Sequence, residues 1–213
     1  MSLLSSISVI IASGVYLIGF IPYIYHVFHG RVVPHPFSWS VWLLFSVQSG
    51  YFVYISQGFS YALIPVVVRT IALCIGSFLG WYYFKKIATR RVDYVALFLA
   101  LITISVGTIL EADKTVILMI IIDFLVLFPT LRKIWVNPKS EDSLAWIMAG
   151  FFHLFMILSL REINFENAGY FIYNTGVNFL VAFLIYRRIQ YISGMRYYVQ
   201  KVRNFFALKK KLW

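Results

Sequence analysis

The sequence is poor in charge, in acidic side chains and in cysteine. Of its 213 residues, 8 are Asp or Glu and 19 are Lys or Arg; the charged share is 13%, about half the globular share of roughly 25%. Apolar residues make up 61%, and mean hydropathy is +0.81. A soluble domain of this size cannot bury that much apolar surface, and disordered chains have the opposite composition. The composition excludes a water-soluble enzyme and indicates a membrane protein with several spans.

Motifs for catalysis or cofactor binding are missing. The single cysteine, Cys74, permits no intramolecular disulfide and no cysteine-based metal site. No Gly-rich phosphate loop and no His-Glu-x-x-His motif occurs. His26, His29 and His35 cluster near one predicted loop, but without acidic partners they make a poor metal site. We therefore expect no cofactor, no metal and no enzymatic activity.

Seven apolar runs are present, separated by short segments that contain helix breakers. They lack the alternation of a β-barrel, so they predict helices, which satisfy their own backbone groups in lipid. Seven spans of about 20 residues would occupy roughly 140 residues, close to what the composition supplies. We predict an all-α membrane protein with seven transmembrane helices. The runs are Ser6–Tyr25, Phe37–Ile55, Ala62–Phe84, Tyr94–Leu110, Thr115–Leu131, Leu144–Leu160 and Gly169–Tyr186.

The basic residues predict the orientation. Of the 19, 16 follow the first, third, fifth and seventh runs, whereas the segments after the other runs hold only Lys114 and Arg161. By the positive-inside rule this places the N-terminus outside and the C-terminus in the cytoplasm, for which we expect a bacterial plasma membrane. Because these charges lie beside the bilayer, they predict contact with lipid and no nucleic-acid partner.

The C-terminal tail, residues 188–213, predicts a basic amphipathic helix on the inner leaflet, in contact with anionic lipid headgroups. Whether its charge only anchors the topology or also makes a specific lipid or protein contact stays open. Its apolar stripe consists of Tyr191, Met195, Tyr198, Val202 and Phe205.

An internal repeat relates the first three runs to the last three. A shift of 107 residues places Pro22 on Pro129 and Trp39 on Trp146. We therefore predict two parallel three-helix repeats, 1–86 and 113–187, joined by an inverting linker helix within 87–112. Chance similarity among apolar helices is the alternative. Two prolines at equivalent depths are candidate hinges, because proline weakens a helix locally.

The repeats and their prolines resemble the PQ-loop and SWEET superfamily of transporters. The matching stretches are Pro22 to Trp39 and Pro129 to Trp146, with Tyr23 and Thr130 where that family has glutamine. The resemblance implies a 3+1+3 arrangement of seven helices and alternating access between two bundles. The superfamily also contains a peptide-binding receptor, so it does not fix one function.

A layer of polar residues at one depth is the strongest functional signal. Counted inward from the predicted outer helix ends, most of them lie roughly 8–15 Å deep at 1.5 Å per residue, near the middle of the bilayer. They come from six of the seven predicted helices, and we predict that they bind a substrate. The layer consists of Tyr16, Gln48, Arg69, Asp123, His153, Asn174 and Asn178.

Arg69 and Asp123 are the formal charges deep inside the predicted spans, where an isolated charge is costly. They form either a structural ion pair or part of a hydrated cavity. In a cavity, Arg69 could take an anionic group, and Asp123 with His153 could carry a coupled proton. Asn174 and Asn178, one helical turn apart, either bridge helices or hold a polar solute.

Two functions are compatible with these features. The first is a carrier that moves a small polar solute, anionic or zwitterionic, by alternating access. The second is a non-transporting receptor, assembly or structural protein whose polar layer is sealed. The sequence leaves a homo-oligomer open in either case.

Overall fold

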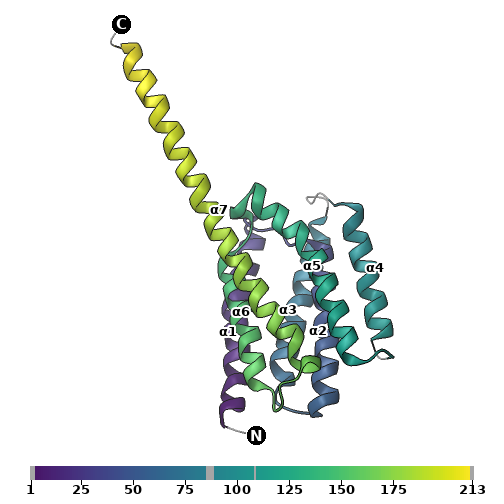
Figure 1. Ribbon diagram of the computed structural model, residues 1–213. Coiled ribbons are helices and arrows are strands. Elements are labelled where there is room, and N and C mark those ends of the chain that lie inside the picture. The colour runs from purple at the N-terminus through teal and green to yellow at the C-terminus, as the bar shows by residue number, and fades with distance from the viewer. Residues whose placement is uncertain (1–2, 85–88, 108, 212–213) are drawn as a thin grey trace.

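The computed structural model describes the backbone of residues 3–84, 89–107 and 109–211, and the side chains of 6–84, 89–107 and 109–194. Within these residues the chain is all-helical, with seven α-helices and one short 3-10 helix (Figure 1). The elements are α1 (Leu3–Phe28), α2 (Pro36–Gln57), α3 (Leu63–Tyr82), α4 (Arg91–Val106), α5 (Ala112–Val136), η2 (Pro138–Ser140), α6 (Ser143–Ser159) and α7 (Phe165–Lys211).

The prediction of seven helices is confirmed, and each apolar run coincides with one helix. The largest difference lies at the C-terminus, where α7 has 47 residues and continues beyond the apolar run without a break. The sequence from Arg187 to Lys211 contains no proline, so no residue there is forced to end the helix. The predicted tail stripe from Met195 onward lies outside the described side chains.

Four helices are long and apolar enough to cross a membrane: Ser6–Phe28, Leu63–Tyr82, Ala112–Val136 and Phe165–Gly194. The other three fall short of those criteria for simple reasons. Helices α4 and α6 have only 16 and 17 residues, and α2 carries polar side chains such as Ser46 and Gln48 on its buried face. Length and composition therefore indicate four of the seven predicted spans.

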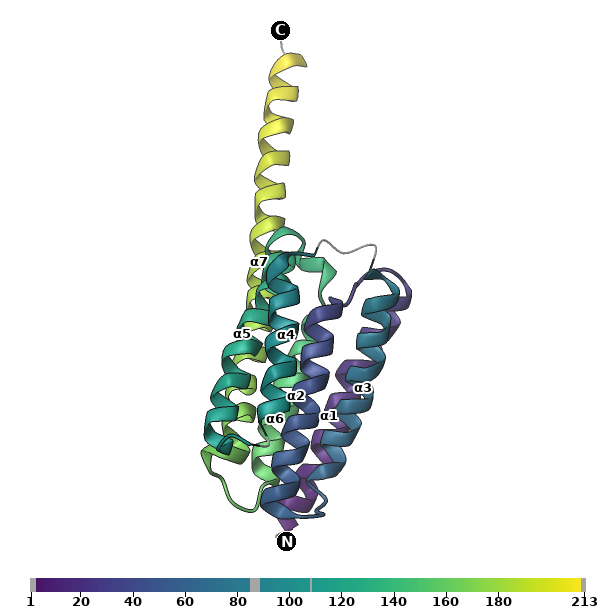
Figure 2. The ribbon, with the colours of Figure 1, turned by 90° about the vertical axis from the view of Figure 1, so that its right-hand side faces the viewer.

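The seven α-helices form one bundle, in which α1 makes its most extensive contact with α6. Helix α3 packs against both α1 and α2, and α7 packs in the same way against α5 and α6. Between these two sets of helices, α1 contacts α6 and α2 contacts α5, while α4 contacts α2 and α5 (Figures 1 and 2). We call α1–α3 the first group and α5–α7 the second group.

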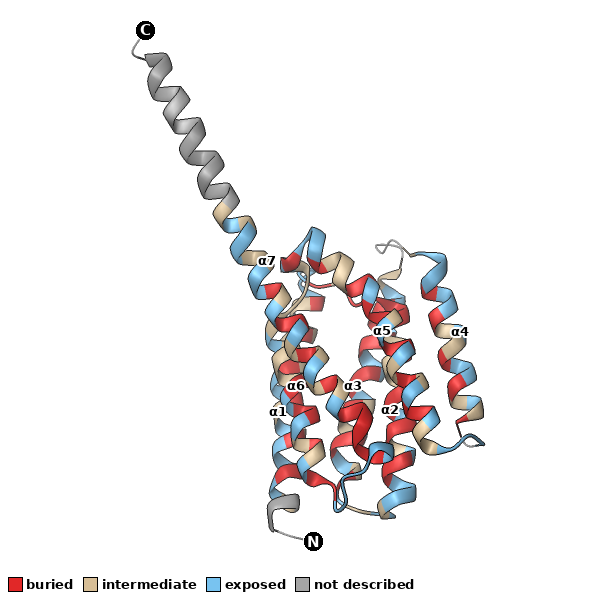
Figure 3. Ribbon diagram, viewed as in Figure 1, coloured by how far each residue is buried: buried red, intermediate tan, exposed pale blue. Residues whose placement is uncertain are grey.

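Buried residues gather on the helix faces that point into the bundle, and many outward faces carry large exposed apolar side chains (Figure 3). Examples are Ile10, Ile21 and Phe78, each more than half exposed. Such an apolar outer surface is typical of a membrane-embedded bundle.

One end of the bundle carries the segments that follow α1 and α5 and the extension of α7 (Figure 1). We call it the basic end, because Arg31 and Lys139 lie in these segments and Arg132 and Lys133 lie near the end of α5. The N-terminus lies at the opposite end. The basic end is the one that the charge distribution predicts to be cytoplasmic.

Candidate functional site

A cavity lies between the first and second groups and extends from the polar layer to the basic end. It offers about 90 Å³ to the centres of water-sized molecules, enough for several waters, since one water needs roughly 10–15 Å³. Its walls consist of Tyr16, Phe20, Tyr23, His35, Trp39, Trp42, Arg69, Leu73, Asp123, Leu127, Thr130, Glu141, Ala145, Trp146, Ala149, His153, Asn174, Val177 and Asn178.

The predicted polar layer supplies much of this wall. The structure brings together all of its members except Gln48, although they come from five different helices. Gln48 is buried at 3% exposure, but it lies on the side of α2 that faces Gly107, just after α4. The wall members are Tyr16, Arg69, Asp123, His153, Asn174 and Asn178.

Arg69 and Asp123 face the cavity without forming a direct ion pair. Both side chains are buried, and no ion pair within 4.0 Å joins them among the residues that the structure describes. The Tyr170 hydroxyl donates to Asp123 Oδ1 at 3.2 Å. The Arg69 guanidinium lies 5.8 Å from the centre of the Phe152 ring and interacts with Tyr16. The two charges interact through space, and both remain part of the cavity wall.

His153 and the two asparagines complete the polar part of the wall. His153 is 2% exposed, and its Nδ1 atom has no hydrogen-bond partner among the residues that the structure describes. A buried nitrogen without a partner is costly, so a ligand or water in the cavity would satisfy it. Asn174 Nδ2 and Asn178 Nδ2 donate to the backbone carbonyls of Tyr170 and Asn174 in α7 itself. These two bonds do not bridge helices.

Three tryptophans form an aromatic wall that the sequence analysis missed as a site. Trp39 and Trp42 look like interfacial residues in the sequence, since aromatic side chains gather near the membrane surface. The structure places both, with Trp146, on the cavity. Trp81 and Trp135, in contrast, are 43% and 65% exposed. The alignment of Trp39 with Trp146 in the internal repeat was the sequence feature that could have indicated their place on the cavity.

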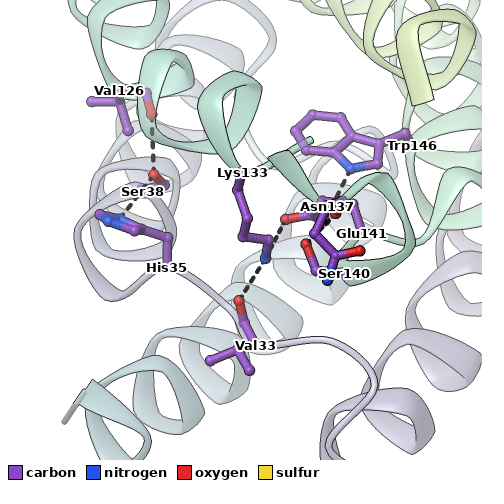
Figure 4. A network of polar contacts seen from close by, with 9 residues as sticks. All are labelled: Val33, His35, Ser38, Val126, Lys133, Asn137, Ser140, Glu141 and Trp146. Carbon is purple, nitrogen blue, oxygen red and sulfur yellow. Dashed lines mark hydrogen bonds and ion pairs between the residues drawn. The ribbon is translucent and has the colours of Figure 1, made fainter. Parts of the chain in front are cut away.

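Polar contacts link separate chain segments at the basic end (Figure 4). Lys133 Nζ lies 2.7 Å from Glu141 Oε1 and donates to the Val33 carbonyl at 2.8 Å. Trp146 Nε1 donates to Glu141 Oε2 at 3.4 Å. The Lys133 side chain thereby ties the connection between α1 and α2 to the connection between α5 and α6.

His35, just before α2, also lines the cavity at this end, although its position in the sequence suggests only loop contacts. Its Nε2 atom lies 3.7 Å from Asp93 Oδ2 of α4. Burial lowers the pKa of the His35 imidazole from its ordinary value of 6.5, and the nearby Asp93 carboxylate opposes that shift. The nearby cations Lys133 and Arg132 act in the same direction as burial.

Ten of the 19 wall residues form five pairs separated by the repeat shift of 107, whereas the other nine, including Arg69 and His153, have no such partner on the wall. In each pair, one residue comes from α1 or α2 and the other from α5 or α6. The pairs are Tyr16 with Asp123, Phe20 with Leu127, Tyr23 with Thr130, Trp39 with Trp146, and Trp42 with Ala149.

Comparisons of this sequence with protein-family models, of the chain with curated proteins, and of its fold with solved structures find no match.

Proposed function

We propose that the protein is a seven-helix membrane carrier that moves a small polar solute by alternating access. In this proposal the first and second groups are parallel three-helix repeats, and α4 is the linker that inverts the chain between them. Helices α2, α4 and α6 cross the bilayer together with the four longer spans. The solute binds in the cavity between the groups.

The pairing of wall residues supports this proposal most directly. Ten wall residues form five pairs at a spacing of 107, with one member from α1 or α2 and the other from α5 or α6, and α3 and α7 each pack against the two other helices of their group. Chance similarity between apolar helices gives no reason for the matched positions to meet at one place. Sites at the interface of internal repeats are a recurrent design in transporters.

The wall residues have complementary roles in the proposed mechanism. Arg69 binds an anionic group of the solute, because a guanidinium offers several directed donors. Asp123 is the candidate proton carrier, with His153 nearby on the same wall. Pro22 and Pro129 lie inside α1 and α5, where a missing backbone hydrogen bond gives each helix a flexible point.

The rival function, a non-transporting receptor or structural protein, predicts that the polar layer is sealed between helices. The cavity at Arg69 and Asp123 and the unpartnered Nδ1 of His153 favour the carrier. A receptor with an open pocket would share these features, so the discriminating property is access from both sides of the membrane.

Cysteine labelling in proteoliposomes tests that access. In a Cys74→Ser background, Ala149→Cys places a thiol on the cavity wall, and Ile18→Cys places one on the 58% exposed outer face of α1. A charged, membrane-impermeant methanethiosulfonate reagent is added from one side at a time. We expect Ala149→Cys to react from both sides and Ile18→Cys from neither. Reaction from one side only would indicate a receptor pocket, and no reaction would indicate a sealed layer.

A further inference from the structure

The aromatic wall is a continuous set of indole rings at the basic end of the cavity. The Trp42 and Trp146 ring centres are 5.7 Å apart with the planes at 87°, and Trp39 lies 6.0 Å from Trp42 at 64°. In such edge-to-face contacts the edge of one ring meets the face of the other. All three indoles are only partly buried, which agrees with their place on the cavity.

The neighbouring structure fixes these rings in position. A Cβ atom on Gly76 of α3 would collide with the Trp39 ring, so glycine at this position lets the indole lie directly on the backbone of α3. The Trp146 ring nitrogen donates to Glu141, which Lys133 holds in turn. A preorganised aromatic surface loses little entropy when a ligand binds, which favours recognition of a ring.

Opposite charges lie deeper on the same wall, and the Trp42 indole reaches one of them, because its side chain hydrogen-bonds to Asp123. Arg69 and Asp123 interact there, with His153 and Asn174 on the same wall. Glu141 also reaches the cavity, but the Lys133 ammonium at 2.7 Å balances its charge. The cavity thus combines three indole rings, set at steep angles to one another, with a polar, charged region that Trp42 adjoins through its hydrogen bond to Asp123.

We propose that the solute carries a flat aromatic ring and an anionic group. The ring lies against Trp42 and Trp146, and the anionic group faces Arg69. This inference rests on the proposed carrier function and names the class of its substrate: aromatic acids or aromatic zwitterions. Tryptophan faces also attract organic cations, but Arg69 on the same wall disfavours a solute whose only charge is positive.

Equilibrium binding to the purified protein in lipid nanodiscs tests the ring requirement. The probes are two matched pairs, L-phenylalanine with L-cyclohexylalanine and benzoate with cyclohexanecarboxylate, and choline as the cationic probe. Within each pair the charge is the same and only the ring changes. We expect the aromatic member to bind about 2- to 10-fold more tightly, the range that aromatic contacts contribute. Choline should bind more weakly than both aromatic probes.

Variants of the aromatic wall test whether the preference for aromatic over saturated probes arises there. Trp42→Leu and Trp146→Leu should bring the ratio within each pair close to one, whereas Trp42→Phe, which keeps an aromatic face, should retain it. Trp135→Leu is the matched control, since Trp135 is 65% exposed and lies outside the cavity. The far-ultraviolet circular dichroism of each variant verifies that it is folded.

The results separate this inference from the carrier proposal. No binding by either aromatic probe, equal or tighter binding by the saturated members, or tightest binding by choline would each overturn the aromatic class. The carrier proposal depends instead on the two-sided labelling of Ala149→Cys, which needs no knowledge of the solute.

Discussion

The ion pair between Lys133 and Glu141 joins chain segments beside the basic end of the cavity, and we predict that it restricts access to the cavity from that end. The same ammonium also binds the Val33 carbonyl in the connection between α1 and α2. Replacing Lys133 by methionine keeps most of the side-chain volume but removes both contacts. We predict that Lys133→Met opens the cavity toward the basic end.

The free-energy cost of losing this ion pair depends on how deeply the pair is buried. The Glu141 side chain is 7% exposed and that of Lys133 is 25% exposed, so the pair lies between a buried and a surface ion pair. Losing one partner costs about 3–5 kcal/mol in the first case, and exposed pairs contribute about 0–1 kcal/mol. An intermediate cost of about 2 kcal/mol in the closed state shifts the equilibrium toward the open state by roughly 30-fold.

The assay is the rate at which the impermeant thiol reagent modifies Ala149→Cys from the basic end. We expect this rate to rise by about 10- to 30-fold in Lys133→Met. Lys139→Met is the control, because Lys139 is exposed and lies between α5 and α6, in the connection that also holds Glu141. Glu141→Gln should accelerate labelling in the same way, and the double variant should add little. Unchanged labelling in a folded Lys133→Met protein, or single effects that multiply in the double variant, would refute the closing role of the pair.

Three further predictions concern other parts of the site. Asp123→Asn should abolish the pH-gradient-driven part of L-phenylalanine uptake into proteoliposomes while binding persists, and full retention of driven uptake would contradict proton coupling through Asp123. Gly76→Ala should lower the stability by about 1–3 kcal/mol in denaturant titrations because its Cβ overlaps the Trp39 ring; Gly14→Ala, with no atom within 4 Å of the new Cβ, should not. Because burial lowers the pKa of folded His35, the unfolded chain takes up the proton first as the pH falls below 6.5. The free energy of unfolding of the wild-type protein should therefore fall more between pH 7.5 and pH 5.5 than that of His35→Gln. Equal losses in the two proteins would show that the pKa of His35 is the same in the folded and unfolded states.

The helices were predictable because apolar runs mark a membrane helix whether its faces meet lipid or protein. The limit appears in α7, where the basic residues after Tyr186 end the apolar run but not the helix. Hydropathy indicates whether a segment lies in an apolar or an aqueous environment. The end of a helix depends instead on residues that disfavour helical backbone angles, such as proline. The same distinction explains α2, whose buried Ser46 and Gln48 lower its hydropathy without shortening it.

Depth counting found most of the polar wall, because residues at one depth on packed helices meet in one plane. It could not give the direction in which each side chain points, which is why Gln48 was assigned to the site although it faces Gly107. The residues at the basic end were missed for other reasons. Trp39 and Trp42 match the interfacial pattern equally well, and no periodicity fixes the position of Glu141, which lies between η2 and α6.

The residues paired at a spacing of 107 also show how the two sides of the cavity differ in chemistry. Trp39 and Trp146 are identical, but Tyr16 corresponds to Asp123 and Trp42 corresponds to Ala149 at the repeat shift of 107. A cavity with two equivalent halves would present the same groups to both ends of a solute. The unequal pairs instead place the carboxylate of Asp123 in the second group and the extra indole of Trp42 in the first. In the proposed carrier, this asymmetry gives the solute one preferred orientation between the first and second groups.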